Sequence, residues 1–159
     1  MADWANFAVA VTGAGAALIG LLVVALSINL GQIVRSAELP GRAVLALLLL
    51  VVPLIAALLL LVPQTGVAYG VELLVAGVLL GGWIGWLVRP SSRSPEQPRA
   101  AWLAGTAGPA VLVVLTTLTG GALLAAGNPA GFYALPVLVL GGFAGALIGT
   151  WVLLVEILR

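Results

Sequence analysis

Glu72 is the residue whose type and position point most directly to chemistry. It is the only charged side chain well inside one of the long apolar segments of the chain, roughly one helical turn from the end of its segment. A carboxylate in hydrocarbon is costly, and intramembrane acids often serve as cation ligands or proton carriers. Glu72 is therefore a candidate for contact with a solute on a membrane pathway or with a partner subunit. The alternative is that its side chain reaches interfacial water at the end of its helix.

Uncharged polar residues gather near the end of the first apolar segment, at Ser27 and Asn29. A buried amide can cross-link helices or bind an ion, so Asn29 is a second candidate for contact with a solute. At this depth the alternative is that Asn29 caps the C-terminus of a helix.

The residue types that are missing exclude most enzyme chemistry. The chain has no Cys and no His, and all six basic residues are Arg. These absences remove thiolate nucleophiles, the usual zinc and haem ligands, the commonest general base and any Schiff-base lysine. No hydrolase, nucleotide-binding or zinc-protease motif is present. We therefore expect no enzyme, no catalytic residue, no cofactor and no metal site.

Composition predicts an all-α integral membrane protein. The chain is 63% hydrophobic and 7% charged, with a mean hydropathy of +1.28, which leaves too few charges to cover a water-soluble surface. Its apolar runs reach the roughly 20 residues that a helix needs to cross a bilayer. Residues 1–159 are expected to form a single transmembrane domain. Turn residues divide it into five helices at about 7–30, 43–62, 67–88, 101–126 and 132–158. A polar linker lies at 89–100.

The arginines predict the orientation of this bundle. In a five-span arrangement all six lie on one side, and the other side carries none. The positive-inside rule makes the arginine side cytoplasmic, so the N-terminus is expected outside and the C-terminus in the cytoplasm. The use of Arg without Lys is typical of a GC-rich bacterial genome, which places the protein in a bacterial plasma membrane. The six are Arg35, Arg42, Arg89, Arg93, Arg99 and Arg159.

Small residues repeat along three of the predicted helices and indicate where helices approach closely. The simpler interpretation is packing within one bundle, and the alternative is that at least one of these faces contacts another subunit of a homo-oligomer. Pro53 and Pro109 each deprive a carbonyl of its amide partner and are expected to kink their helices. The predicted packing positions are Gly13, Gly20, Gly77, Gly81, Gly85, Gly141, Gly145 and Gly149.

An internal repeat relates the second and third predicted helices to the fourth and fifth. Each pair opens with Arg-Ala and carries a proline ten or eleven residues later. The motif at 80–85, LGGWIG, then matches LGGFAG at 140–145. The architecture predicted from this pattern is one helix followed by two equivalent hairpins, related by an axis along the membrane normal. The alternative is chance similarity in a chain rich in Leu, Val, Ala and Gly.

The segment at 13–30, GAGAALIGLLVVALSINL, resembles the first helix of a group of small, uncharacterised bacterial membrane proteins. Some of these are labelled modulators of a membrane-bound AAA protease. The resemblance covers the first helix and the hydropathy layout, and it implies an accessory or unassigned membrane protein without assigning any residue a role.

Two functions follow as expectations. The first is a small, homo-oligomeric channel or permeation protein for an ion or small solute, in which Glu72, Asn29 and Ser27 contact the pathway. The second is a non-catalytic accessory protein that binds another membrane protein through its glycine faces. The expected partners are the lipid bilayer, further copies of the chain and another membrane protein, with no nucleic acid.

Overall fold

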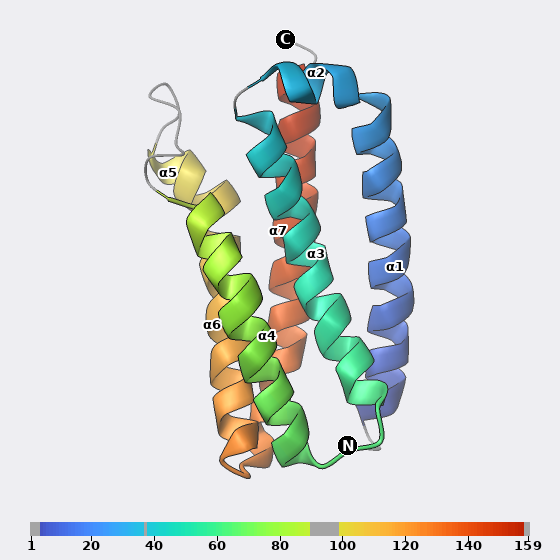
Figure 1. Cartoon of the computed structure of the whole chain (residues 1–159), viewed down its shortest axis with the longest axis vertical. Coiled ribbons are helices and arrows are strands. Elements are labelled where there is room, and N and C mark those ends of the chain that lie inside the picture. Colours follow the sequence, from blue (N-terminus) through green and yellow to red (C-terminus); the bar gives the residue numbers. More distant parts are fainter. Residues whose placement is uncertain (1–3, 37, 90–98, 158–159) are drawn as a thin grey trace.

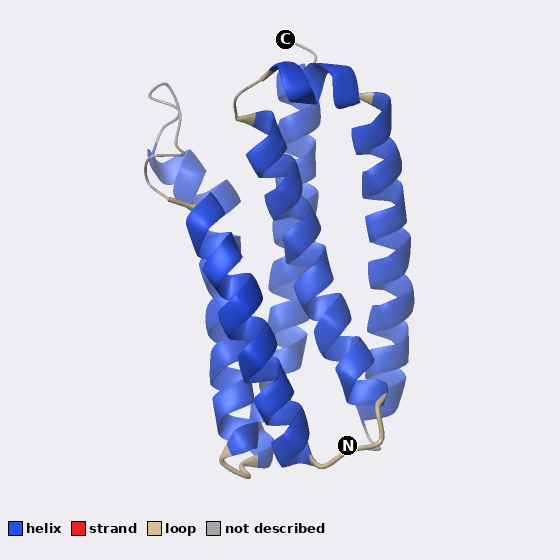
Figure 2. Ribbon diagram, viewed as in Figure 1, coloured by secondary structure: helices blue, strands red, loops and turns tan. Residues whose placement is uncertain are grey.

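The computed structural model describes residues 4–36, 38–89 and 99–157, and its regular structure in these ranges is entirely helical (Figures 1 and 2). Two short elements are not ordinary α-helix: η3 is one π-helical turn, and η4 is a 3₁₀ turn. In chain order the elements are α1 (Ala5–Ile28), α2 (Leu30–Arg35), α3 (Leu39–Leu61), α4 (Gly66–Leu87), α5 (Arg99–Trp102), η3 (Leu103–Ala107), α6 (Gly108–Ala125), η4 (Pro129–Tyr133) and α7 (Ala134–Ile157).

Five helical segments in the described part of the chain are long and apolar enough to cross a membrane, which confirms that part of the prediction. They are α1, α3, α4, η3 with α6, and η4 with α7. Their ends differ slightly from those expected. The second long helix begins at Leu39 instead of residue 43, because the hydroxyl of Ser36 accepts hydrogen bonds from the backbone N–H groups of Glu38 and Leu39. The short helix α2 was not predicted.

The bundle is built around α3, which packs against α1, α4 and α7, while α6 packs against α4 and α7. In the most apolar stretch of α3, 56% of residues are buried, compared with 17% in α1. Figure 1 shows α1 and α4 on opposite sides of α3. The helix α1 is therefore a peripheral member of the bundle, and most of its surface faces away from the rest of the chain.

The two ends of the bundle differ in composition. The N-terminal end of α1 lies at one end, with the α3–α4 turn and η4, and α2, α5 and the C-terminal part of α7 lie at the other (Figure 1). We call the second the arginine end, because helix boundaries there place Arg35, Arg42, Arg89 and Arg99. Arg93 and Arg159 lie outside the described residues. The first we call the aromatic end.

Both prolines face α7, whose glycines admit them. The helix α3 continues through Pro53, and a Cβ built on Gly142 would lie 2.5 Å from the carbonyl oxygen of Leu49, the group that Pro53 deprives of its amide partner. The ring of Pro109 lies directly against Gly145. Pro53 of α3 and Pro109 of α6 therefore pack against two nearby positions of α7, Gly142 and Gly145.

The sequence led us to expect Pro109 in the interior of a continuous α-helix, and the structure differs from this expectation. Pro109 lies in the first turn of α6, where proline is tolerated, and the π-helical turn η3 precedes it. The N–H of Gly108 bonds to the carbonyl of Leu103, five residues earlier. This π-bulge accommodates the missing N–H of Pro109 without ending the helical segment.

Only some of the predicted packing glycines of α4 lie against α6. A Cβ on Gly77 would lie 2.9 Å from Leu118 Cδ2, and one on Gly81 would lie 2.9 Å from Val114 Cγ1. Gly85, in contrast, has no atom within 4 Å of its Cβ position, and neither have Gly13 and Gly20 on α1. The spacing of glycines therefore does not by itself identify which ones touch a neighbouring helix of this chain.

Some close backbone-to-backbone approaches involve glycines outside the predicted packing positions. Gly70 of α4 and Gly121 of α6 face each other, because a Cβ on Gly121 would lie 3.0 Å from the carbonyl oxygen of Gly70. Gly120 meets η4 in the same way, with a Cβ position 3.2 Å from the carbonyl oxygen of Gly131. Backbone-to-backbone contact of this kind supplies the van der Waals attraction that holds helices together in lipid.

Aromatic rings join three helices at the aromatic end. Trp4, at the start of α1, stacks on Phe132 of η4 with ring centroids 6.0 Å apart, and Phe132 stacks on Tyr69 of α4 at 6.1 Å. The rings of Phe7 and Tyr133 contact Trp4 edge-on. Tyr69 is fully buried, and its hydroxyl donates to the carbonyl of Ala56 on α3 across 3.0 Å.

Tyr69→Phe is expected to destabilise the bundle slightly, by ~0.5–1.5 kcal/mol, because one buried interhelical hydrogen bond is lost while the ring contacts remain. Equilibrium unfolding of the purified protein in mixed micelles measures this change. Tyr133→Phe is the matched control, because that side chain is 73% exposed. Equal effects of the two substitutions would show that the Tyr69 hydroxyl contributes nothing specific.

Candidate functional site

Glu72 lies in the first half of α4, on the edge of a helix face that points away from the bundle. The side chain is half-buried, and Val75, Leu79 and Trp83 on the adjoining surface are 54%, 68% and 50% exposed. The glycines Gly70 and Gly77 lie on the opposite side of α4, against α6. The acid is therefore not enclosed by the described part of the chain.

Gln64, in the turn between α3 and α4, holds the Glu72 side chain in place. Its Nε2 donates to Glu72 Oε2 across 2.8 Å and to the carbonyl of Leu59 across 2.9 Å. The turn itself is fixed by Thr65, whose side chain accepts the N–H of Ala68 and caps α4. An amide orients a carboxylate without neutralising its charge. We call Glu72, Gln64 and the Leu59 carbonyl the Glu72 site.

The structure does not bring Ser27 or Asn29 to the Glu72 site. Both lie toward the arginine end of α1, whereas Glu72 lies toward the aromatic end of α4. The hydroxyl of Ser27 donates to Val23 O and the amide of Asn29 donates to Ala25 O, both within α1. Asn29 is the C-terminal cap residue of α1, which matches the structural alternative that the sequence left open for it.

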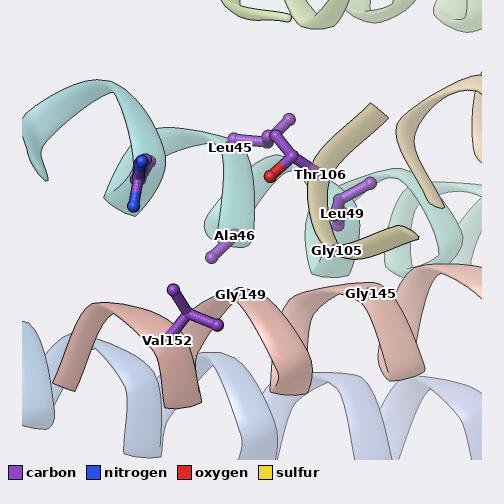
Figure 3. A pocket seen from close by; sticks show the side chains of 9 residues that line it. Leu45, Ala46, Leu49, Gly105, Thr106, Gly145, Gly149 and Val152 are labelled. Atoms are coloured by element: carbon purple, nitrogen blue, oxygen red, sulfur yellow. The ribbon is translucent and has the colours of Figure 1, made fainter. Parts of the chain in front are cut away.

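A pocket of about 160 Å³ opens near the arginine end, between α3, η3 and α7 (Figure 3). Figure 3 shows Gly145 and Gly149 of α7 across the pocket from Ala46 and Gly105. The polar groups of its wall come from Arg42 and Thr106. The lining residues are Arg42, Leu45, Ala46, Leu49, Gly105, Thr106, Gly145, Gly149 and Val152. We call this cavity the arginine-end pocket.

The pocket exists because small residues meet where α6 departs from α-helical geometry. The nearest atom to a Cβ built on Gly149 is Ala46 Cβ, 4.0 Å away, and the nearest to one on Gly105 is Ile148 Cγ2 at 3.9 Å. The carbonyl of Gly105 has no α-helical partner, because its partner would be the missing N–H of Pro109. A Cβ added at either glycine would therefore make only ordinary van der Waals contact.

Arg42 supplies the positive charge at this pocket. It forms a 3.6 Å ion pair with Glu38, one turn earlier, and the two side chains are 19% and 46% exposed. A partly exposed pair of this spacing contributes only ~0–1 kcal/mol to stability. The sequence used Arg42 for the orientation and for the internal repeat, and did not indicate a pocket. Two features of its wall are visible in the sequence, Arg42 near the start of a proline-containing helix and Gly105 four residues before Pro109, but the sequence does not show that they meet.

An apolar groove runs between α4 and α6, with a volume of about 240 Å³. It forms where Gly81 and Gly85 leave α4 without side chains beside Val114 and Ala110 of α6. Ile84, Val88, Val111 and Leu115 complete its wall. We call it the α4–α6 groove.

Comparisons with protein-family models, with curated proteins and with solved structures found no match to this chain. The Glu72 site, the arginine-end pocket and the α4–α6 groove are three places in the described part of the chain that could contact a solute or a partner. Among the residues described, no group of three His, Cys, Asp or Glu side chains could hold a metal ion.

Proposed function

We propose that the protein spans a bacterial plasma membrane five times and forms a homo-oligomer that provides a permeation pathway for an ion or small solute. The N-terminus would lie outside and the C-terminus in the cytoplasm, as the positive-inside rule requires when the arginines lie at one end. The protein has no catalytic role in this proposal, because the chain lacks the residue types that most enzymes use.

The observation that carries the proposal is the position of Glu72 on the edge of the outward face of α4. A carboxylate on the lipid-facing surface of a subunit is costly, and its recorded partner, Gln64, is a neutral amide. The cost is removed when that face turns toward a water-filled space between subunits. A cation passing there would interact favourably with the acid.

Two complementary surfaces on opposite sides of the subunit support a ring of copies. On α1 a stripe of exposed small residues points away from the bundle. On the other side of the subunit, where Figure 1 shows α4 and α6, lies the α4–α6 groove. Contact between two different patches is heterologous and closes into a ring when the rotation allows. The α1 stripe comprises Gly13, Ala17, Gly20, Val24 and Ser27, all exposed, and the next position, Gly31, is exposed on α2.

The packing of the two hairpins supports their origin by duplication. The second helix of the first hairpin, α4, packs on α6, and the second helix of the other hairpin, α7, packs on α3. This reciprocal exchange is what an axis along the membrane normal would produce. Corresponding glycines of the repeated motifs at 80–85 and 140–145 have different surroundings. Gly142 is tightly packed, whereas its counterpart Gly82 has no neighbour within 4 Å of its Cβ position. Gly82 is exposed on α4, next in sequence to Gly81 of the α4–α6 groove.

Flux measurements in proteoliposomes test the proposal. Glu72→Gln is expected to reduce cation flux about tenfold or more, because at an effective dielectric constant of about 20 a carboxylate attracts a cation 4 Å away by ~4 kcal/mol. Glu38→Gln makes the same chemical change outside the long apolar helices and is expected to leave flux unchanged. Unchanged flux in Glu72→Gln would remove Glu72 from the pathway, and absence of flux in the natural protein would refute the permeation function.

The second candidate is an accessory protein that binds and modulates another membrane protein. The exposure of α1 favours it, because a small-residue stripe can receive a foreign helix as readily as a further copy. Purification in mild detergent would then recover a specific partner at fixed stoichiometry, and the isolated protein would conduct nothing. A homogeneous homo-oligomer with measurable flux would exclude this candidate.

A further inference from the structure

The arginine-end pocket has the shape and polarity of a site for an amphiphile. Arg42 lies in the first turn of α3 and Leu49 two turns later, so the wall between them extends about 10 Å along the helix axis at 1.5 Å per residue. The charge is at the end of the bundle, and Leu45, Leu49 and Val152 make the deeper wall apolar.

An apolar cavity does not hold water readily, since a buried water needs several polar partners. Thr106 is the one hydroxyl among the lining residues, and it comes from η3, across the pocket from α7 (Figure 3). A chain of CH₂ groups suits the apolar wall, and an anionic head suits the planar guanidinium, which pairs with phosphate through two parallel hydrogen bonds.

We propose that the arginine-end pocket binds an anionic phospholipid of the adjacent membrane leaflet, with its phosphate on Arg42 and an acyl chain along Leu45, Leu49 and Val152. The hydroxyl of Thr106 donates to an ester oxygen of the same lipid. Basic pockets between membrane helices recognise lipid head groups in this way. The inference requires insertion in a bilayer, and it depends neither on the direction of insertion nor on permeation.

Glu38 tunes this site, because its carboxylate lies 3.6 Å from the Arg42 guanidinium and competes with a phosphate. Removing that carboxylate should leave Arg42 more available to the lipid. Glu38→Gln is therefore expected to raise retention of an anionic lipid about threefold, a gain that a merely unfolded variant would not show.

Native mass spectrometry of the full-length protein in detergent, with added phosphatidylglycerol or phosphatidylcholine, tests the proposal. The natural protein is expected to retain phosphatidylglycerol about tenfold better, and Arg42→Gln should remove this preference. Gly149→Leu should abolish retention of both lipids, because the added side chain fills the pocket. Arg35→Gln, which removes an exposed arginine at the same end, is the control and should change nothing.

Three results would overturn the proposal. Equal retention of the two lipids would show that the pocket does not recognise the charge of the head group. Equal losses in Arg42→Gln and Arg35→Gln would reduce the effect to the general charge of the arginine end. Displacement of the lipid by millimolar inorganic phosphate or glycerol phosphate would assign the pocket to a soluble anion. Helical content of each variant is checked by circular dichroism, and none of these readouts involves flux, so the permeation proposal stands or falls separately.

Discussion

Gly145→Ala is expected to destabilise the bundle by ~1–3 kcal/mol or more, whereas Gly149→Ala, one turn later on the same face of α7, should be neutral or stabilising. A Cβ at position 145 would overlap the ring of Pro109 and lie 3.2 Å from Leu49 Cδ1. The proline ring is fixed to its backbone, so α6 itself must move. At position 149 the nearest atom is 4.0 Å away, and alanine gains helix propensity of up to about 1 kcal/mol over glycine.

The two variants form a matched pair, since both add one methyl group to a glycine of the same helix. Equilibrium unfolding in mixed micelles gives the free-energy difference directly. Equal stability of the two variants would contradict the contact between Pro109 and Gly145, on which the packing of α6 against α7 depends. A destabilised Gly149→Ala would indicate that the arginine-end pocket is narrower than the structure gives it.

The number and type of the long helices could be predicted because each depends on a local quantity. A run of apolar residues long enough to cross a bilayer can be read directly from the sequence, and the described part of the chain contains five such helices. The short helix α2 and the π-turn η3 escaped prediction. The helix α2 has too few residues to show a hydrophobic periodicity. The π-turn η3 depends on how the backbone before Pro109 adjusts to the hydrogen bond that proline cannot donate.

Glycine spacing could not identify the packed faces, because it marks every smooth stripe and does not say which stripe has a neighbour. Gly77 and Gly85 belong to the same stripe of α4, yet one lies against Leu118 and Thr117 and the other has no atom within 4 Å. The distinction depends on the angle at which α4 and α6 diverge, a property of the whole bundle. The backbone contact at Gly70 was missed for the same reason, since it lies outside the repeating pattern.

The candidate sites show the same division between local and long-range information. The sequence places Glu72 inside a long apolar segment, but it does not indicate its partner, because Gln64 approaches only after the turn closes. Asn29 and Ser27 were further candidates for contact with a solute, and each donates to a carbonyl of α1 instead. The arginine-end pocket combines residues from three elements distant in sequence, so no local pattern could predict it.

The other large effect is expected at the interface of the proposed homo-oligomer. Ala17→Leu and Gly20→Leu on α1 are each expected to weaken association about 5- to 150-fold per interface, because a bulky side chain on a small-residue face costs ~1–3 kcal/mol. Both positions are exposed, and a Cβ at Gly20 meets nothing within 4 Å, so the fold of the subunit should be unaffected. Light scattering in detergent measures the subunit number. Ala144→Leu, the same change at an exposed position of α7, is the control.

Cysteine cross-linking separates a head-to-tail ring from a symmetric pair joined by α1 against α1. The chain contains no Cys, so each introduced thiol is unique. Gly20 lies 15 residues after the start of α1 and Gly82 lies 16 residues after the start of α4, and both helices run from the aromatic end to the arginine end, so the two positions lie at similar depth. A mixture of Gly20→Cys and Gly82→Cys copies is expected to cross-link between subunits. If Gly20→Cys alone cross-links efficiently and the mixture yields no Gly20–Gly82 product, the interface is isologous, and a ring that places Glu72 beside a central pathway is excluded.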